Sequence, residues 1–207
     1  MINMAYRGNN EDGSWLSLIG KGVCFDSGGL DIKSTEGMKT MFLDKSGACS
    51  CLVAFEQIVK ERLRINVTVT LGMVENFISG RSYRPSDIIQ SKKGITVEIA
   101  DTDAEGRLVL ADCMTWTQQH YKVSKMVELS TLTYSVITAL GTTFAGIFGN
   151  SPSFNATLQA VGELISERGW ILPLEEEHRE MIESKVADCI SDINDGNPGA
   201  SIAAAFL

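Results

Sequence analysis

Histidine is almost absent from this sequence, since His120 and His178 are the only two among 207 residues. They cannot supply a three-histidine metal site, and they do not form the paired-histidine helix motif of many metalloproteases. Positive charge is also scarce, with 18 basic against 26 acidic residues and a formal net charge of -8. This balance argues against a general binder of phosphate backbones, so we expect no nucleic-acid partner. Any metal chemistry in this chain must therefore use carboxylates.

Long apolar runs and paired cysteine motifs are missing as well. The longest apolar stretch, residues 136–148, is broken by Thr and Gly and is too short to span a bilayer. The first residues lack the apolar core of a signal peptide, and the five cysteines form neither a CxxC metal motif nor a disulfide framework. We therefore expect a cytoplasmic protein with no membrane association, whose cysteines are small buried residues in a reducing compartment.

The composition that remains is that of a globular protein, with 44% hydrophobic and 21% charged residues. The length suits a single domain with an ample core, and no linker or internal repeat divides residues 1–207. Apolar, β-branched segments alternate with segments of helical periodicity, which predicts an α/β fold. Its central sheet is expected to be mixed but largely parallel, with helices on both faces. The predicted strands are residues 15–19, 65–74, 125–132 and 144–148, with a hairpin over 88–99, and the predicted helices are 46–63, 108–121, 134–140, 153–167 and 175–186.

Several acidic residues follow the predicted strands in short, glycine-rich segments. Residues 20–33 are expected to form a loop that carries Asp26, and residues 101–106 an acidic loop before a helix. In an extended segment Asp103 and Glu105 would point to the same side, because they are two residues apart. Any one of these acids alone is best explained as a solvated surface residue. Taken together, they lie where α/β folds place their sites.

The chemistry of these side chains points to divalent cations. Oxygen-rich sites without histidine suit Mg²⁺ and Mn²⁺ best, but Zn²⁺ also accepts carboxylates. The residues alone therefore predict a divalent-metal site that holds one or two ions.

Two motifs then connect the chain with a known family. Residues 20–29, Gly-Lys-Gly-Val-Cys-Phe-Asp-Ser-Gly-Gly, and residues 102–108, Thr-Asp-Ala-Glu-Gly-Arg-Leu, closely resemble signatures of the leucyl aminopeptidase family. These enzymes are cytosolic exopeptidases with two metal ions. The spacing from Lys21 through Asp44 to Arg107 also resembles the family without gaps. The resemblance implies a phosphorylase/hydrolase-like α/β catalytic domain and a metal-dependent aminopeptidase that releases leucine-like N-terminal residues from peptides.

The resemblance also implies a set of metal ligands. One ion would bind Lys21, Asp26, Asp44 and Glu105, and the second would bind Asp26, Glu105 and Asp103, so that two carboxylates bridge the pair. Bridging anions offset the repulsion of two nearby dications, and a lysine can be a ligand only as the neutral amine. The two ions are expected to be Zn²⁺ or Mn²⁺, with Mg²⁺ and Co²⁺ as other candidates.

Catalytic and substrate-binding roles follow from the same resemblance. Lys33 would stabilise the developing gem-diolate oxygen, and Arg107 would hold a bicarbonate that relays the proton in place of a histidine base. The pocket for the first side chain would be lined by Met41, Thr131, Leu132 and Tyr134. The resemblance further implies a homo-hexamer.

The sequence departs from the family in its extent and at three positions. We expect residues 1–207 to lack the family's N-terminal domain and to be a catalytic domain truncated at its C-terminus, after the apolar residues 200–207. Asp101 stands where asparagine is usual, and Lys45 where small or apolar residues are more usual. Tyr134 stands where glycine is common, and it could narrow the substrate pocket or be an ordinary packed aromatic.

Two alternatives to an aminopeptidase remain open at this point. The truncation and the three departures would also suit a catalytically inactive scaffold or binding module that keeps the fold. A different two-metal hydrolase, such as a phosphoesterase, would act on phosphate esters, but the lack of histidine ligands disfavours it.

Overall fold

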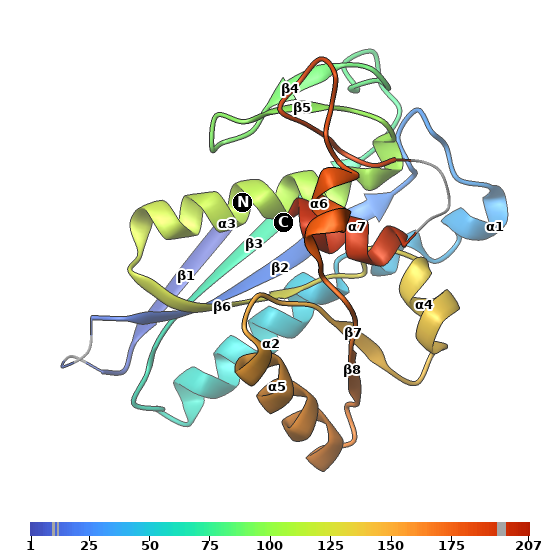
Figure 1. The fold of residues 1–207 in the computed structure, drawn as a ribbon. Coiled ribbons are helices and arrows are strands. Elements are labelled where there is room, and N and C mark those ends of the chain that lie inside the picture. The colour runs from blue at the N-terminus through green and yellow to red at the C-terminus, as the bar shows by residue number, and fades with distance from the viewer. Residues whose placement is uncertain (10, 12, 194–197) are drawn as a thin grey trace.

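A four-stranded sheet forms the centre of the computed structural model, which describes residues 1–9, 11, 13–193 and 198–207 (Figure 1). The strand order is β1-β3-β2-β6. Strands β2, β3 and β6 run parallel, and β1 pairs with β3 in the antiparallel direction at one edge. The bounds are Ile2–Arg7 for β1, Trp15–Asp26 for β2, Asn66–Asn76 for β3 and Val123–Leu129 for β6. The sheet is therefore mixed and largely parallel, as predicted.

Helices cover both faces of this sheet, which confirms the α/β architecture (Figure 1). Successive side chains of a strand point to opposite faces, so neighbouring residues of β2 belong to two different cores. Leu18 packs with the face of helix α2 (Ser46–Lys60) that carries Ala48 and Cys51. Ile19 packs with Leu110 and Cys113 of helix α3 (Glu105–His120) on the other face. The two helices thus fix the position of β2, whose C-terminal end carries Asp26.

Shorter elements surround this core. Two small sheets have the orders β4-β5-β9 and β7-β8. Among the described residues, no helix is long and apolar enough to cross a membrane. The remaining elements are α1 (Thr35–Met38), the 3-10 helix η1 (Met41–Leu43), β4 (Ile88–Gln90), β5 (Thr96–Glu98), the 3-10 helix η2 (Thr102–Ala104), α4 (Ser135–Leu140), β7 (Ala145–Ile147), α5 (Pro152–Leu164), β8 (Gly169–Ile171), α6 (Glu176–Glu180), β9 (Cys189–Ile190) and α7 (Gly199–Phe206).

Two predicted loops are regular structure instead. Residues 20–26 continue β2, because the missing side chain of Gly20 lets α2 approach so closely that a Cβ there would lie 2.6 Å from the Ala48 Cα. The acidic loop winds into η2, because the Asp101 side chain accepts a 2.7 Å hydrogen bond from the Asp103 N–H. The segment of Asp103 and Glu105 is therefore helical rather than extended.

Other boundaries also differ from the sequence predictions. Helix α6 covers only Glu176–Glu180, much less than the predicted 175–186, and the edge strand β1 was not expected. The hairpin was predicted correctly, since β4 and β5 pair in the antiparallel direction. These differences lie away from the C-terminal end of β2 and do not move the acidic residues.

The contact between α2 and β6 leaves no room for a side chain at Gly47. A Cβ there would lie 1.9 Å from the Leu129 carbonyl oxygen, so Gly47→Ala must push the helix away from the sheet. We expect this substitution to lower the free energy of unfolding by about 2 kcal/mol, as overpacking of a tight core does. Denaturant titration measures it. Gly13→Ala is the control, because nothing lies within 4 Å of a Cβ at Gly13, and an equal loss in both variants would contradict the prediction.

Candidate metal centre

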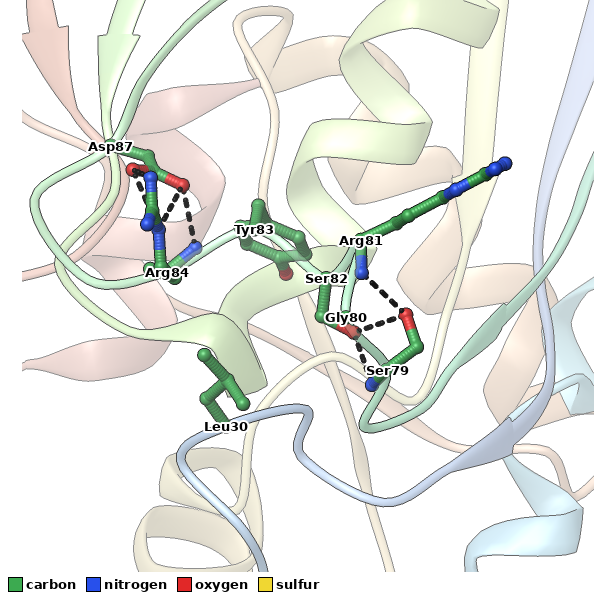
Figure 2. A pocket seen from close by; sticks show the side chains of 8 residues that line it. All are labelled: Leu30, Ser79, Gly80, Arg81, Ser82, Tyr83, Arg84 and Asp87. Atoms are coloured by element: carbon green, nitrogen blue, oxygen red, sulfur yellow. Dashed lines mark hydrogen bonds and ion pairs between the residues drawn. The ribbon is translucent and has the colours of Figure 1, made fainter.

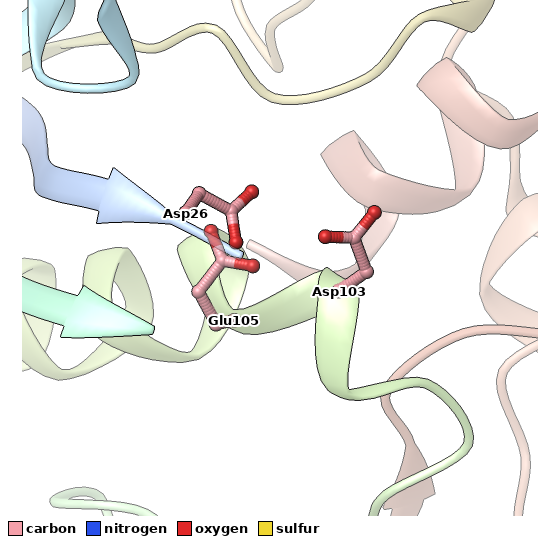
Figure 3. A group of neighbouring side chains, drawn as sticks. All are labelled: Asp26, Asp103 and Glu105. Atoms are coloured by element: carbon pink, nitrogen blue, oxygen red, sulfur yellow. The ribbon is translucent and has the colours of Figure 1, made fainter. Parts of the chain in front are cut away.

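Three carboxylates converge where strand β2 ends and helix α3 begins (Figure 3). Asp26 is the last residue of β2, Asp103 lies in η2, and Glu105 is the first residue of α3. Each offers an oxygen within 4.8 Å of the oxygens of the other two. Asp26 and Glu105 are only 3% and 4% exposed. This grouping could hold a metal ion, and it lies at the carboxyl end of a parallel strand, where α/β folds place their sites.

A fourth carboxylate and two lysines complete the cluster. The Lys21 ammonium lies 2.8 Å from Asp44 and 3.0 Å from Glu105. The Lys33 ammonium lies 2.9 Å from Asp26 and also contacts Asp103. The structure therefore brings together all five residues that the sequence predicts as metal ligands, together with Lys33. We call these six residues the carboxylate–lysine ring: Lys21, Asp26, Lys33, Asp44, Asp103 and Glu105.

Asn76 belongs to the same site, although the sequence analysis gave it no role. It is the last residue of β3, next to Asp26 in the parallel pair, and it is 5% exposed. Its amide nitrogen donates to Asp26 Oδ1 at 2.9 Å, to the Thr102 carbonyl at 3.0 Å and to Glu105 Oε2 at 3.3 Å. The signal that could have found it is its position, since the ends of two adjacent parallel strands must lie side by side.

Burial is the main influence on three carboxylates of the ring. It raises the pKa of Glu105 to about 7 and that of Asp103 to about 6, and it also raises the pKa of Asp44. Burial alone would lower the pKa of Lys21, but the Glu105 and Asp44 carboxylates outweigh it, so the pKa lies above its ordinary value. Without metal ions, these ion pairs therefore stabilise the charged forms of the buried carboxylates and of the Lys21 amine.

The donor set of the ring suits divalent cations. Four carboxylates face two ammonium groups, which leaves an excess of negative charge when all are ionised. Apart from the lysines, the buried oxygens Asp44 Oδ2, Asp103 Oδ1 and Glu105 Oε1 have no hydrogen-bond partner in the described part of the chain. Buried carboxylates of this kind are expected to be paired or to coordinate metals. The residues present therefore fit such ions.

Arg107 lies two residues after Glu105 in α3 and is only 3% exposed. Its Nη1 donates to the Ser191 carbonyl at 2.6 Å, and its Nη2 lies 3.4 Å from Asp192 Oδ2. Its buried Nε has no hydrogen-bond partner within the described residues. The sequence analysis predicted a catalytic role for Arg107. It could not predict the contacts with Ser191 and Asp192, which are 84 and 85 residues away.

The four residues predicted to line a substrate pocket lie in different surroundings. Thr131 is in the site, where its hydroxyl donates to Asp44 Oδ1 at 2.7 Å and its carbonyl accepts from Lys21 at 3.3 Å. Leu132 packs against the core of Ile19, Leu110 and Cys113. Met41 begins η1 and is half-buried, whereas Tyr134 precedes α4 and is 65% exposed. The Tyr134 side chain is therefore mostly uncovered by the described residues.

A shallow groove of about 430 Å³ lies beside the ring, and none of these four residues lines it. Figure 2 shows Leu30 from the glycine-rich segment facing the loop of residues 79–87, with the Arg81 side chain pointing away from Leu30. The Tyr83 hydroxyl donates to the Thr102 carbonyl at 2.8 Å, which ties this loop to the segment that carries Asp103.

Known proteins resemble this chain over its whole length. The model of the cytosol aminopeptidase family, catalytic domain, matches residues 1–207. The chain belongs to the cytosol aminopeptidase family. It is 38% identical over 208 residues to a probable cytosol aminopeptidase of Rickettsia massiliae, and 44% identical over 192 residues to one of Methylorubrum populi. These matches cover 100% and 93% of this chain, but 42% and 38% of the relatives.

Solved structures show the same fold as this family member. The leucyl aminopeptidase of Leishmania major, in complex with actinonin, superposes with a TM-score of 0.93 at 28% identity over 99% of this chain and 41% of that one. The bottromycin maturation enzyme BotP gives a TM-score of 0.89 at 31% identity, over 99% and 43% of the two chains. This chain thus spans about two fifths of the length of its relatives.

Proposed function

We propose that this chain carries the reaction centre of a metal-dependent aminopeptidase, which releases leucine-like N-terminal residues from peptides. The carboxylate–lysine ring is the observation that carries the proposal, because it gathers four carboxylates and two lysines at one strand end of a cytosol aminopeptidase family member. The names of the relatives support the same activity and a cytoplasmic location.

Two divalent cations are assigned to the ring. Lys21, Asp26, Asp44 and Glu105 would hold the first, and Asp26, Glu105 and Asp103 the second, as Zn²⁺ or Mn²⁺ with Mg²⁺ or Co²⁺ as other candidates. When bound, such ions lower the pKa of a water molecule and polarise a peptide carbonyl. Lys21 must give up its proton to act as a ligand, and the proximity of dications favours its neutral amine.

Lys33 and Arg107 are assigned the catalytic roles. The Lys33 side chain is 14% exposed, which leaves its ammonium accessible from the site, and it would stabilise negative charge that develops on a substrate oxygen. Arg107 would hold a bicarbonate that relays the proton. The unpartnered, buried Nε of Arg107 supports an anion there, although Asp192 already lies 3.4 Å from Nη2.

The substrate is assigned to the side of the ring that faces η1 and the segment after β6. Met41, Thr131, Leu132 and Tyr134 would line the pocket for the first side chain, with the exposed Tyr134 at its border. We further propose that residues 1–207 are an incomplete catalytic domain and that the whole protein assembles as a homo-hexamer.

Hydrolysis of an aminoacyl-amide fluorogenic substrate by the full-length protein tests the proposal. We expect turnover that depends on added Mn²⁺ and disappears after removal of metal by a chelator. Near-stoichiometric metal without turnover would favour a catalytically inactive scaffold instead. Activity on phosphate esters with none on aminoacyl amides would identify a different two-metal hydrolase.

A further inference from the structure

Lys45 connects the two segments that carry Asp26 and Asp44, and nothing in the proposed reaction uses it. Its ammonium donates to the Cys24 carbonyl at 3.0 Å and also to the Phe42 carbonyl. Cys24 lies two residues before Asp26 in β2. Phe42 lies within η1, two residues before Asp44, which directly follows η1. One half-buried side chain thus joins the backbones of two members of the carboxylate–lysine ring.

The acceptor in β2 lies in an irregular part of the strand. The pairing of β2 with β3 shifts between Val23, opposite Val74, and Asp26, opposite Asn76. Cys24 and Phe25 therefore oppose the single residue Glu75, which is the geometry of a β-bulge. A bulge redirects the residue that follows it and disturbs the ladder hydrogen bonds. The direction in which Asp26 leaves the strand therefore depends on what holds the bulged backbone, and Lys45 contacts it.

The other end of the connection lies at the start of α2. Lys45 precedes this helix and makes no capping hydrogen bond with its side chain, while its carbonyl accepts the first helical bond, from the Cys49 N–H. A cation is unfavourable at a helix N-terminus, where the helix dipole is positive. Lysine at this position therefore does not serve the stability of α2. The long side chain of lysine instead allows this position to reach from the start of α2 to the backbone of β2.

Few groups hold the Asp44 carboxylate besides this backbone connection. Its described partners are the Thr131 hydroxyl at 2.7 Å and the Lys21 ammonium at 2.8 Å. In the proposed function Lys21 becomes a neutral metal ligand, so the charged contact with Asp44 is lost. The position of Asp44 then depends more strongly on the backbone of residues 42–45.

We propose that Lys45 is a positioning residue, which holds the Asp44 segment against the bulge of β2 and so sets the separation of Asp26 and Asp44 for metal binding. This inference rests on the proposed metal centre. Groups that orient metal ligands without touching the metal commonly change affinity by about 10- to 100-fold when they are removed.

Calorimetric titration of the metal-free, full-length protein with Mn²⁺ alone tests the inference. Lys45→Met keeps the chain length but removes the donor, and we expect the tighter Mn²⁺ site to weaken about 10-fold or more. Lys45→Arg keeps a donor and should restore most of the affinity. Lys60→Met is the matched control, because it removes a lysine from the other end of α2, where the ammonium pairs with the exposed Glu56 at 2.7 Å.

Thermal unfolding of the metal-free variants separates positioning from a structural role. The midpoint of Lys45→Met should change little, because the lost hydrogen bonds are offset by removal of a cation from the N-terminus of α2. A lower unfolding midpoint together with weaker Mn²⁺ affinity in Lys45→Met would overturn the inference. Equal Mn²⁺ affinities in Lys45→Met and the unsubstituted protein would overturn it as well. Either result would leave the proposed function standing. Absence of Mn²⁺ binding by the unsubstituted protein would overturn the proposed function and the inference together.

Discussion

Glu105→Gln should reduce metal-dependent peptide hydrolysis by a factor on the order of 10³, equal to about 4 kcal/mol of transition-state stabilisation. The substitution keeps the size of the side chain but replaces one carboxylate oxygen with an amide nitrogen. Glu105 is 4% exposed, contacts Lys21 at 3.0 Å and accepts from Asn76 at 3.3 Å. In the proposed function Glu105 would help to hold both cations, so the substitution would weaken both sites together. Steady-state turnover with saturating Mn²⁺ measures the effect.

The control for Glu105→Gln is Glu61→Gln, which removes an exposed carboxylate at the end of α2. We expect this control to keep full activity and full metal content. Metal content should fall in Glu105→Gln, and the metal-free protein should still show a cooperative thermal transition, because Lys21 keeps its ion pair with Asp44 at 2.8 Å. Unchanged turnover and two bound ions in Glu105→Gln would rule out a bridging role.

Four of the five proposed metal ligands, Lys21, Asp26, Asp103 and Glu105, could be predicted because they sit in two short motifs, whereas Asp44 was predicted from its spacing to them. The sequence alone could place Asp26 and Glu105 near one edge of the sheet, because the ends of parallel strands and the helices that follow them gather there. Their role as metal ligands is implied only by the family resemblance. Asn76 follows from the same rule, but only when the order of the strands is known. The pairing of β2 with β3, which places Asn76 beside Asp26, is a tertiary fact that no local pattern contains.

The secondary-structure prediction was wrong where tertiary contacts override local preference. Glycines at 20 and 22 indicated a loop, but their small size lets α2 pack directly on β2. The acidic run 101–106 also indicated a loop, but the Asp101 side chain caps the turn that leads into α3. In both places the features that look like loop signals are the ones that allow close packing or helix initiation.

Contacts between distant segments could not be predicted from sequence at all. Arg107 meets Ser191 and Asp192, and Lys45 meets Cys24, which are separated by 84, 85 and 21 residues. These contacts depend on where β9 and η1 lie relative to the sheet. The sequence shows Lys45 as a departure from the family pattern. Its contact with Cys24 could not be predicted, because it depends on the bulge in β2.

Lys33→Met should separate catalysis from metal binding. In the proposed function the Lys33 ammonium stabilises charge on the substrate oxygen and is not a ligand, so its removal should lower kcat by about 10²- to 10³-fold, as loss of one oxyanion donor does. Burial alone would lower the pKa of Lys33, but the hydrogen bonds with Asp103 and Asp26 outweigh it, so the group is an ammonium at neutral pH. Steady-state kinetics at saturating Mn²⁺ measures the change.

Metal affinity gives this prediction its second readout. The Lys33 ammonium pairs with Asp26 at 2.9 Å and contacts Asp103, so it competes with cations for the same carboxylates. Removing it should leave metal binding intact or tighter while kcat falls, and KM should change little because the lost contact forms in the transition state. Lys39→Met, at an exposed lysine paired with Glu36 at 2.7 Å, is the control that should alter neither quantity. A parallel loss of metal and activity in Lys33→Met would instead make Lys33 part of the framework that assembles the carboxylates, because a purely catalytic ammonium cannot be needed for cations to bind.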